Sequence, residues 1–481
     1  MNNARTPLPP LLVVGDALLD HDLCGRAERL APDAPVPVVH GTRRSSRPGG
    51  AALAACLAAA DGRPVTLVTA LGTDGASDTL RDLLADRVDL VEVPLDGALS
   101  SKTRVLAGDR PLLRLDDGEG RARGATRAAA TAVAAAAAVL VADYGRGTAD
   151  VLREALAEAA ARAPVVWDPH VRGRPPVPGV RLATPSAQEA RAFAQQLGRD
   201  GEPGEEAGLR SAARDARVLI GAWQAQAVAV TLGERGALLS HGETPLLVPT
   251  PATAAGDPCG AGDRFAATAA GLLADGALTE AAVQGAVHAA TRYVAGGGAR
   301  AVAAPDVRGA LPDPPADGTG DPTADARRTA ARVRAAGGTV VAAGGCFDLL
   351  HAGHVALLEA ARRAGDCLIV CVNSDDSVRR RKGGGRPLVP AADRVLVLRA
   401  LECVDAVAVF AEDTPERVLG ELRPHIWAKG GDYARTRLPE QPLVESWGGQ
   451  VLLLPYLDGR STTGLARRAA EAPAPTGGTT R

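Results

Sequence analysis

The sequence predicts an α/β protein with two domains, a doubly wound sheet followed by a Rossmann-like domain. Three observations lead to this prediction. The length of 481 residues exceeds that of one ordinary domain and favours two or three. Short apolar runs that end in glycine or aspartate alternate with alanine-rich helical segments, as in parallel sheets covered by helices. A stretch rich in proline, aspartate and glycine, at about 305–327, indicates a flexible linker.

These observations place the first domain at 1–310 and the second at 327–470. The linker is expected at 311–326 and a disordered tail at 471–481. Hydrophobic residues make up 46% of the chain, whereas aromatic residues make up only 2%. The two cores must therefore be packed mainly from alanine, valine and leucine.

The composition excludes several classes of function. The formal net charge of −2 leaves no global basic surface for nucleic acid. The first ten residues lack the layout of a signal peptide, and no apolar run is long enough to span a bilayer. The seven cysteines form no C-x-x-C pair, which favours reduced thiols. We therefore expect a cytoplasmic protein that binds neither nucleic acid nor membrane.

The first domain opens with an apolar strand at 11–14 that ends in Gly15-Asp16. Open α/β sheets bind ligands at the carboxyl ends of their strands, so Asp16 is a candidate for contacting sugar hydroxyls. A helix or turn cap is the alternative. The proline-interrupted segment 34–39 predicts an edge or lid strand. Gly49 and Gly50 precede an alanine-rich helix and allow close approach of a ligand to the backbone.

Three cations lie in a region of β patterning in the first domain, Lys102, Arg104 and Arg114. They are candidates for holding a substrate phosphate, with exposed strand cations as the alternative. Further buried strands are expected at 65–69, 139–141, 165–167 and 228–232.

The segment Gly260-Ala261-Gly262-Asp263 opens a long helix. Backbone N–H groups at such a helix start form an anion hole. Asp263 stands directly behind them, where it can take a proton from an attacking hydroxyl. This pairing of a base with a neutralised phosphate is what phosphoryl transfer requires.

The first domain resembles the ribokinase (PfkB-type) sugar kinases over about 8–308. The resemblance is carried by Gly15-Asp16, Arg47–Ala52, Gly72–Asp74, Gly233–Ala237 and Gly260–Asp263 in this order. It implies that Asp263 is the catalytic base, that Gly260, Ala261 and Gly262 form the anion hole, and that Asp16, Gly49 and Gly50 belong to the sugar site. It also implies that Ser186, Ala187, Gln188 and Glu189 lie by the nucleotide, with Glu189 a candidate Mg²⁺ ligand.

The chain departs from the family pattern at four positions. Ser186 and Leu53 stand where the family usually has asparagine, and Pro258 and Cys259 stand where it usually has threonine or valine-threonine. The proline rigidifies the loop and removes one N–H. These departures motivate an alternative in which the kinase half is only a scaffold.

The second domain is organised around Gly344–Asp366. An apolar strand at 339–343, a glycine turn and a helix at 355–363 place N–H groups and a helix dipole against a phosphate. His351 and His354 lie where the turn becomes the helix. Because no cysteine or carboxylate lies at the usual zinc spacing, two imidazoles here suit stabilisation of a pentacoordinate phosphorus better than metal binding.

This segment resembles the H-x-G-H motif of the nucleotidyltransferase superfamily, with Phe347, Asp348 and His351–His354 matching. Asp348 could position a sugar phosphate or Mg²⁺, or cap a turn. Arg381 and Lys382 belong to a basic cluster that could clamp phosphates, with a solvated loop as the alternative.

Two further anion sites are expected in the second domain. Lys429 follows a strand at 425–428. Ser461, Thr462 and Thr463 open the last helix, where their hydroxyl and N–H groups suit phosphate oxygens.

The whole chain resembles the bifunctional heptose 7-phosphate kinase / heptose 1-phosphate adenylyltransferase family. The motifs F-D-x-L-H-A-G-H, V-N-S-D, R-x-K-G…R-P, E-D-T-P, K-G-G-D-Y and G-x-S-T-T follow in the order of that family. The resemblance implies ATP-dependent phosphorylation of heptose 7-phosphate, then adenylyl transfer from ATP to heptose 1-phosphate. It also implies a separate bisphosphate phosphatase and Mg²⁺ at both sites, and we expect a homodimer.

In the second reaction the sugar phosphate itself attacks, so the protein needs only to orient groups and stabilise charge. We expect His351 and His354 on the α- and β-phosphates, Lys429 on the developing charge, and Ser461–Thr463 on the β- and γ-phosphates. The alternative is a transferase for another sugar or polyol phosphate that uses CTP or GTP, joined to a scaffold-only kinase half.

Overall fold

The computed structural model describes the chain in two compact units. Unit 1 comprises Met1–Gly242 and Thr250–Val307, and unit 2 comprises Glu243–Pro249 and Arg308–Arg481. The described residues are 8–32, 34–108, 110–198, 208–251, 256–299, 322–383, 385–431 and 438–455. Among them, no helix combines the length and apolar character needed to cross a bilayer.

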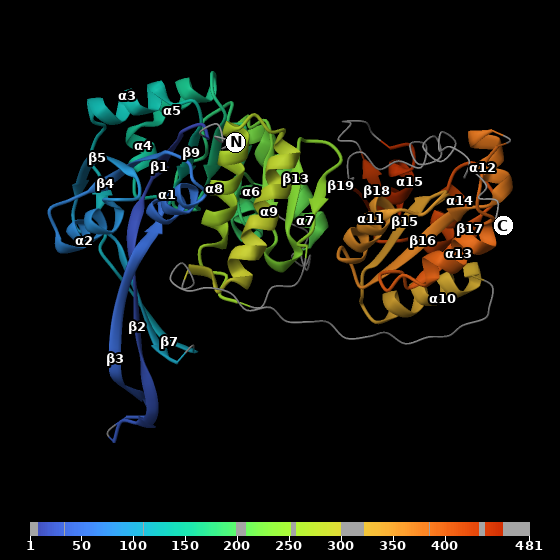
Figure 1. Cartoon of the computed structure of the whole chain (residues 1–481), viewed down its shortest axis with the longest axis horizontal. Coiled ribbons are helices and arrows are strands. Elements are labelled where there is room, and N and C mark those ends of the chain that lie inside the picture. Colours follow the sequence, from blue (N-terminus) through green and yellow to red (C-terminus); the bar gives the residue numbers. More distant parts are fainter. Residues whose placement is uncertain are drawn as a thin grey trace, which may run out of the picture. The chain divides into compact units, whose positions relative to one another are not determined.

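Unit 1 is built on a mostly parallel sheet (Figure 1). Its order is β13-β12-β11-β10-β9-β1-β4-β5-β8, with β13 antiparallel to β12 and β8 antiparallel to β5. The central strand β1 is buried at every residue because helices cover both faces, which explains its continuous apolar run. The strands are β1 (Leu11–Gly15), β4 (Val65–Leu71), β5 (Asp89–Asp96), β8 (Arg121–Ala122), β9 (Val139–Ala142), β10 (Val165–Asp168), β11 (Leu182–Ala183), β12 (Val228–Thr231) and β13 (Ala237–Ser240).

The helices of unit 1 confirm the doubly wound architecture. Helix α1 is alanine-rich and almost entirely buried, since its small side chains allow it to pack closely against the sheet. Helix α2 is capped by Asp74, whose carboxylate accepts hydrogen bonds from Ala76 N and Ser77 N. The helices are α1 (Ala51–Ala60), α2 (Gly75–Leu84), α3 (Arg127–Ala135), α4 (Thr148–Val151), α5 (Arg153–Ala160), α6 (Ala187–Gln196), α7 (Leu209–Trp223), α8 (Ala261–Ala274) and α9 (Thr279–Ala295), with the 3₁₀ turn η1 (Gly233–Arg235).

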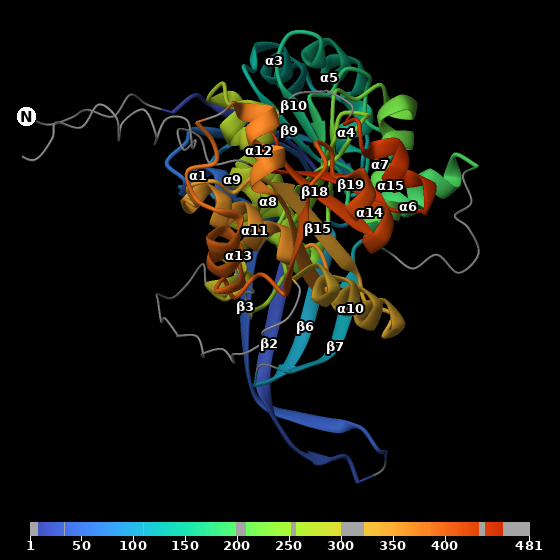
Figure 2. The same cartoon turned by 90° about the vertical axis from the view of Figure 1, so that its right-hand side faces the viewer.

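A second, four-stranded sheet forms the predicted lid of unit 1. Its order is β3-β2-β6-β7, and Figures 1 and 2 show it projecting from the body of the unit. Strands β2 and β3 are antiparallel, and β2 pairs in parallel with β6. The strands are β2 (Ala17–Leu30), β3 (Pro37–Gly50), β6 (Ser101–Ala107) and β7 (Arg110–Asp117).

Unit 2 is a parallel sheet of order β17-β16-β15-β18-β19-β14, as expected for a Rossmann-like domain. Trp427 is fully buried in its core. The strands are β14 (Leu246–Val248), β15 (Val340–Gly345), β16 (Cys367–Asn373), β17 (Ala406–Phe410), β18 (Ile426–Gly431) and β19 (Gln450–Pro455). The helices are α10 (Pro322–Ala335), α11 (Ala352–Arg362), α12 (Asp375–Lys382), α13 (Ala391–Arg399), α14 (Glu416–Leu422) and α15 (Gln441–Ser446).

The predicted domain boundaries stay a prediction. Helix α10 begins at Pro322 and so includes the last residues of the predicted linker, 311–326. Strand β14 belongs to unit 2, although its residues lie within the predicted first domain, 1–310. The predicted tail at 471–481 lies outside the described residues.

Candidate active sites

The anion hole predicted in unit 1 lies at the start of α8. Gly260 caps this helix with a φ of 81°, a left-handed conformation that glycine adopts without strain. A Cβ atom here would lie 2.6 Å from the Tyr293 hydroxyl and 2.7 Å from Leu53 Cδ2, so only glycine fits. The Ala261 N–H donates to the Pro258 carbonyl at 3.0 Å, whereas the N–H groups that follow it in the first turn point out of the helix start, where helices bind anions.

Asp263 lies in the first turn of α8, behind these N–H groups. Its Oδ1 accepts a hydrogen bond of 2.7 Å from the Tyr144 hydroxyl. Burial raises the pKa of Asp263 to about 7, while this hydrogen bond and the charge of Lys102 act in the opposite direction. A base with a pKa near neutrality is suited to proton abstraction at physiological pH.

Two lid cations reach the anion hole. Nη2 of Arg104 lies 3.0 Å from Sγ of Cys259, the residue before Gly260. The Lys102 ammonium lies 5.7 Å from the centre of the Tyr144 ring. Burial lowers the pKa of Lys102, and the charge of Asp20 opposes that shift.

Arg114 lies on the exposed strand β7, directly opposite Arg104 of β6. It forms two hydrogen bonds with the carboxylate of Asp116, of 2.6 and 2.5 Å. This contact fits the exposed-cation alternative, so a direct role for Arg114 in substrate binding stays a prediction.

Asp16 is occupied by backbone groups of the loop after β9. Its carboxylate accepts hydrogen bonds from Tyr144 N at 3.0 Å, Arg146 N at 2.8 Å and Thr148 N at 3.0 Å. It therefore anchors this loop, as the turn-capping alternative expects. Contact with a sugar hydroxyl stays a prediction.

Asp20 on β2 is not predicted from the sequence, yet it lies at the centre of the lid face. It is 4% exposed, and Oδ1 has no hydrogen-bond partner among the described residues. Its carboxylate lies 3.4 Å from Arg104 Nη1 and 3.7 Å from Arg47 Nη2. A Cβ atom on Gly49 would lie 2.9 Å from Oδ2, so this glycine keeps space beside the acid. The available signal was the strand alternation that puts Asp20 and Asp22 on one face.

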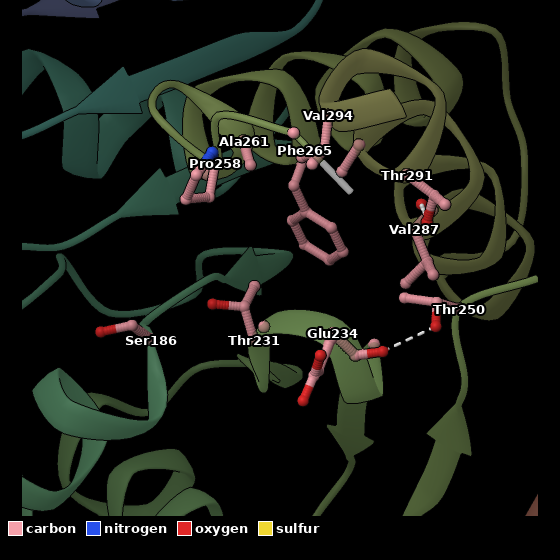
Figure 3. Close-up of a pocket in the computed structure, with 15 residues that line it drawn as sticks. Ser186, Thr231, Glu234, Thr250, Pro258, Ala261, Phe265, Val287, Thr291 and Val294 are labelled. Carbon is pink, nitrogen blue, oxygen red and sulfur yellow. Dashed lines mark hydrogen bonds between the residues drawn. The ribbon is translucent and has the colours of Figure 1, made fainter. Parts of the chain in front are cut away.

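A pocket of about 580 Å³ adjoins the anion hole (Figure 3). Figure 3 shows Phe265 and Val294 on one side and Thr231 and Glu234 on the other. Thr250 closes one end and donates a hydrogen bond of 2.6 Å to the Glu234 carbonyl. An apolar slot beside an anion hole suits a nucleotide base and its phosphates. Its remaining lining residues are Ser186, Gly233, Gly236, Gly256, Pro258, Ala261, Gly262, Val287, Ala290 and Thr291.

The predicted Ser186–Glu189 segment begins helix α6. Ser186 and Glu189 form a capping box in which Glu189 Oε2 accepts from Ser186 N at 2.9 Å and from Ser186 Oγ at 2.7 Å. Ala187 and Gln188 occupy the first turn between them. Ser186 thus fulfils a capping role at the wall of the pocket, where the resembling family has asparagine.

Asp168, at the end of β10, interacts with other carboxylates of unit 1. Among the described residues, no group of three or more histidine, cysteine or acidic side chains is arranged to hold a metal. Burial, together with the charges of Asp263 and Glu189, raises the pKa of Asp168 well above its ordinary value. A divalent cation would relieve this repulsion, and Mg²⁺ at ATP sites takes most of its ligands from phosphates and water. Asp168 accepts a hydrogen bond of 2.7 Å from the Thr184 hydroxyl and Glu189 belongs to the capping box of α6, so a Mg²⁺ site at these two acids stays a prediction.

The H-x-G-H motif of unit 2 lies between β15 and α11. Phe347 and Leu349 have φ values of 46° and 57°, left-handed conformations that side chains rarely adopt and that cluster at functional loops. His351 caps α11 by accepting a hydrogen bond of 3.1 Å from Gly353 N. The motif therefore places its imidazoles at the positive end of a helix, as predicted.

The rings of His351 and His354 stack, with centroids 3.9 Å apart, and Phe347 lies against His354 at 5.3 Å. Burial, helped by the charges of His351 and Lys382, lowers the pKa of His354 to about 4. His354 is thus neutral at physiological pH, and a neutral imidazole can still donate one hydrogen bond to a phosphate oxygen.

Asp348 is completely buried and anchors a loop. It accepts hydrogen bonds from Arg386 Nη1 at 2.6 Å, Leu388 N at 2.9 Å and Val389 N at 3.0 Å. Burial opposes ionisation, but these hydrogen bonds prevail and hold the pKa of Asp348 below its usual value. The contacts fit the structural alternative, and a direct role toward phosphate or Mg²⁺ stays a prediction.

Arg394 is a second anchor of this site and is not predicted from the sequence. It is 2% exposed. It donates to the carbonyls of Cys346 at 2.6 Å and Asn373 at 2.9 Å, and to Asp375 Oδ1 at 2.7 Å. It thereby joins the ends of β15 and β16. An arginine in a helical pattern carries no local mark of this role.

The basic residues of unit 2 point to different partners. Lys382 Nζ lies 3.0 Å from Cys346 Sγ, at the loop of the histidine motif, whereas Arg381 donates to the Asp413 carbonyl. Lys429 lies at the carboxyl end of β18, beside β15, which carries the histidine motif. The predicted Ser461, Thr462 and Thr463 lie outside the described residues.

Comparison with known proteins decides the family. The pfkB family carbohydrate kinase model matches residues 10–306, and the cytidylyltransferase-like model matches residues 342–452. Bifunctional protein HldE of Streptomyces coelicolor is 64% identical over 470 residues, which cover 97% of this chain and 98% of that protein. Bifunctional protein HldE of Pseudomonas aeruginosa PAO1 is 38% identical over 467 residues, which cover 95% of this chain and 97% of that protein.

The chain belongs to the HldE family of bifunctional proteins. It is therefore a carbohydrate kinase joined to a nucleotidyltransferase, and the hypothesis of a kinase–adenylyltransferase is confirmed over the scaffold-only alternative. Among solved structures, the ribokinase of Thermotoga maritima aligns with a TM-score of 0.47 at 20% identity, covering 60% of this chain and 93% of that chain.

In this HldE-family chain, each unit gathers some of the predicted residues around one helix start. In unit 1, Lys102 and Arg104 lie beside Gly260–Asp263. In unit 2, Lys382 lies beside the histidine motif. Their specific roles toward substrates are proposals.

Proposed function

We propose that the kinase unit phosphorylates heptose 7-phosphate at its anomeric hydroxyl and that the transferase unit joins heptose 1-phosphate to AMP. ATP is the co-substrate of both reactions, and the final products are ADP-heptose and pyrophosphate. The observation that carries the proposal is the matched design of the two sites. Each places its reactive side chains at a helix N-terminus, with Asp263 on α8 and the stacked His351 and His354 on α11.

In the first reaction the γ-phosphate of ATP lies against the N–H groups at the start of α8, and the adenine base of ATP fills the pocket in Figure 3. Asp263 takes the proton of the anomeric hydroxyl. At the same time the anomeric oxygen of the sugar bonds to the γ-phosphorus, and the bond between the γ-phosphorus and ADP breaks. Lys102 and Arg104, on the lid strand β6, neutralise the negative charge of the transferred phosphate. Mg²⁺, when bound near Asp168 and Glu189, would supply further neutralisation of the phosphate oxygens.

In the second reaction the phosphate of heptose 1-phosphate attacks the α-phosphorus of ATP. A phosphorus–oxygen bond forms to the sugar phosphate, the bond to the β-phosphate breaks, and pyrophosphate leaves. His351 and His354 donate hydrogen bonds to the transferring phosphate, while Lys429 and Lys382 balance its developing charge. Ser461–Thr463 are proposed to hold the β- and γ-phosphates, and Mg²⁺ to accompany the nucleotide.

The chemistry of the two reactions requires a separate enzyme. The kinase product carries two phosphates, whereas the transferase acts on a sugar with one, so a distinct phosphatase must remove the 7-phosphate between the two steps. We place all three steps in the cytoplasm.

We also propose that the protein acts as a homodimer. The lid strand β7 exposes Leu112, Leu113 and Leu115, with exposed fractions of 37%, 55% and 47%. An edge strand with apolar side chains of this kind is commonly covered by another chain. The oligomeric state follows from sedimentation of the purified protein.

The kinase proposal is tested by following ADP formation from heptose 7-phosphate and ATP with wild type and Asp263→Asn. We expect steady turnover that the substitution lowers by at least about a thousandfold, since it removes the base. No ADP above background from the wild type would reject the kinase reaction.

The transferase proposal is tested by pyrophosphate release from ATP and heptose 1-phosphate. His354→Ala is expected to abolish release while kinase activity persists in the same preparation. Replacing ATP with CTP or GTP tests the base preference, and faster release with either would overturn the adenylyl assignment.

A further inference from the structure

Tyr144 connects two carboxylates of the kinase unit. Its hydroxyl donates a hydrogen bond of 2.7 Å to Asp263 Oδ1, and its backbone N–H donates one of 3.0 Å to Asp16 Oδ2. The first contact reaches the proposed base from the loop after β9, which is distant from α8 in the sequence. The second fixes the backbone from which the phenol projects.

The loop that carries Tyr144 is held at several points. Asp16 also accepts from Arg146 N and Thr148 N, and Asp143 accepts from Gly145 N at 2.8 Å. Gly145 has a φ of 73°, and a Cβ atom there would lie 2.6 Å from the Arg172 carbonyl carbon. Because two buried carboxylates bind its backbone, the loop leaves the phenol little freedom to move.

The direction of the hydrogen bond follows from the environment of the phenol. Burial and the charge of Asp263 raise the pKa of Tyr144, so the hydroxyl stays protonated and donates. A donor fixed on Oδ1 restricts rotation of the carboxylate and leaves Oδ2 to face the incoming hydroxyl.

We propose that Tyr144 is a positioning residue of the kinase reaction, holding Oδ1 of Asp263 so that Oδ2 receives the proton of the sugar, and that Asp16 acts through it by fixing its loop. This inference rests on the proposed function, in which Asp263 is the base. It assigns to Asp16 a task distinct from direct sugar binding.

The charged and titratable groups around Asp263 come from several elements. Lys102 on β6 and Asp20 on β2 act on it from the lid, Asp168 from the end of β10, and Tyr293 from α9. Burial dominates and raises the pKa of Asp263 to about 7, while the Tyr144 hydrogen bond and Lys102 lower it. Removing the Tyr144 hydrogen bond must therefore raise this pKa further.

The test is the pH profile of kcat/KM for heptose 7-phosphate, measured on the full chain from about pH 5.5 to about pH 9.5 for wild type and Tyr144→Phe. The acid limb, where Asp263 gains its proton, is expected to move up by about half a pH unit or more. The high-pH plateau is expected to fall about tenfold, because the carboxylate loses its fixed orientation. The KM for ATP is expected to stay unchanged.

Tyr293→Phe is the matched control. Its hydroxyl lies in the same environment but has no hydrogen-bond partner among the described residues, so its removal leaves the acid limb in place. Pyrophosphate release by the transferase unit reports the integrity of each preparation. Asp16→Asn, which weakens the loop anchor without touching Asp263, is expected to shift the limb in the same direction.

An unshifted acid limb in Tyr144→Phe, with or without a lower plateau, would overturn the positioning role. If Tyr144→Phe is recovered without transferase activity, the acid limb of Asp16→Asn is measured in its place, and an unshifted limb in that variant would overturn the positioning role. Failure of the proposed function looks different, because wild type would then lack kinase activity or Asp263→Asn would retain it.

Discussion

The ammonium of Lys429 lies 3.3 Å from Oε1 of Glu440, a carboxylate that is almost fully buried in unit 2. The same ammonium lies 5.2 Å from the centre of the Trp427 ring. The lysine is thus held between a carboxylate and an indole face at the carboxyl end of β18, the edge where parallel sheets bind ligands.

Glu440→Gln is expected to lower kcat for pyrophosphate release about tenfold, because the neutral amide holds the ammonium less firmly and Lys429 loses its orientation. The KM for ATP should change little. Steady-state kinetics of the transferase reaction measure both quantities. Glu445→Gln is the control, because Glu445 is exposed on α15, the helix that Glu440 precedes. Equal rates for both variants would contradict the assignment.

Asp348→Ala is expected to destabilise unit 2 by about 3 kcal/mol, because it leaves the largely buried Arg386 and two backbone N–H groups without their acceptor. Loss of pyrophosphate-forming activity with increasing urea measures the change. Asp376→Ala is the control, since it removes the exposed ion pair with Arg379 and should cost less than about 1 kcal/mol. Equal urea midpoints for both variants would argue against the anchoring role.

The stability of unit 1 is expected to depend on pH through Asp143. Burial and the charge of Asp16 raise the pKa of Asp143 from 3.8 to about 7, so the folded state binds its proton more tightly than the unfolded state does. The resulting stabilisation is full below about pH 4 and is lost as the pH rises through about 7. Burial also raises the pKa of Asp263 to about 7, so its ionisation lowers the stability of unit 1 over the same pH range.

Asp143→Asn should therefore stabilise the protein at pH 8 relative to wild type, by on the order of 4 kcal/mol, and by less than half as much at pH 5. The amide oxygen can still accept the Gly145 hydrogen bond. Thermal unfolding of wild type and variant across this range measures the difference, with Asp86→Asn on the surface as the control. A gain that is equal at both pH values would exclude titration of Asp143 as its cause.

The parts of the molecule that follow from local sequence were predicted well. The apolar runs that became β1, β9 and β10 end within about a residue of their predicted ends, because buried parallel strands need continuous apolar residues. The glycine-rich turns before α8 and α11 were also predicted, since their geometry is encoded within a few residues, while the roles of the residues in them stay predictions. The long lid strand β2 was largely missed because Asp20 and Asp22 interrupt its apolar pattern.

The roles of individual polar residues could not be predicted when their partners lie far away in the chain. Arg394 gains its role only when folding brings it to the carbonyl of Cys346, and Glu440 only when α15 packs beside β18. For Asp16 and Asp348 the sequence left open a choice between ligand binding and a structural cap. The choice depends on which backbone N–H groups the fold brings to each carboxylate.

The pocket beside α8 is expected to bind ATP for the kinase reaction alone. Ala290→Phe places a ring into the cavity of about 580 Å³ from α9, where Val287 and Thr291 also line it. The KM for ATP in ADP formation should rise at least about tenfold through steric exclusion of the base. The KM for ATP in pyrophosphate release should be unchanged, because that reaction uses the site on α11. Ala281→Phe, on the exposed face of α9, controls for the substitution itself, and an equal effect of both variants would remove this pocket from ATP binding.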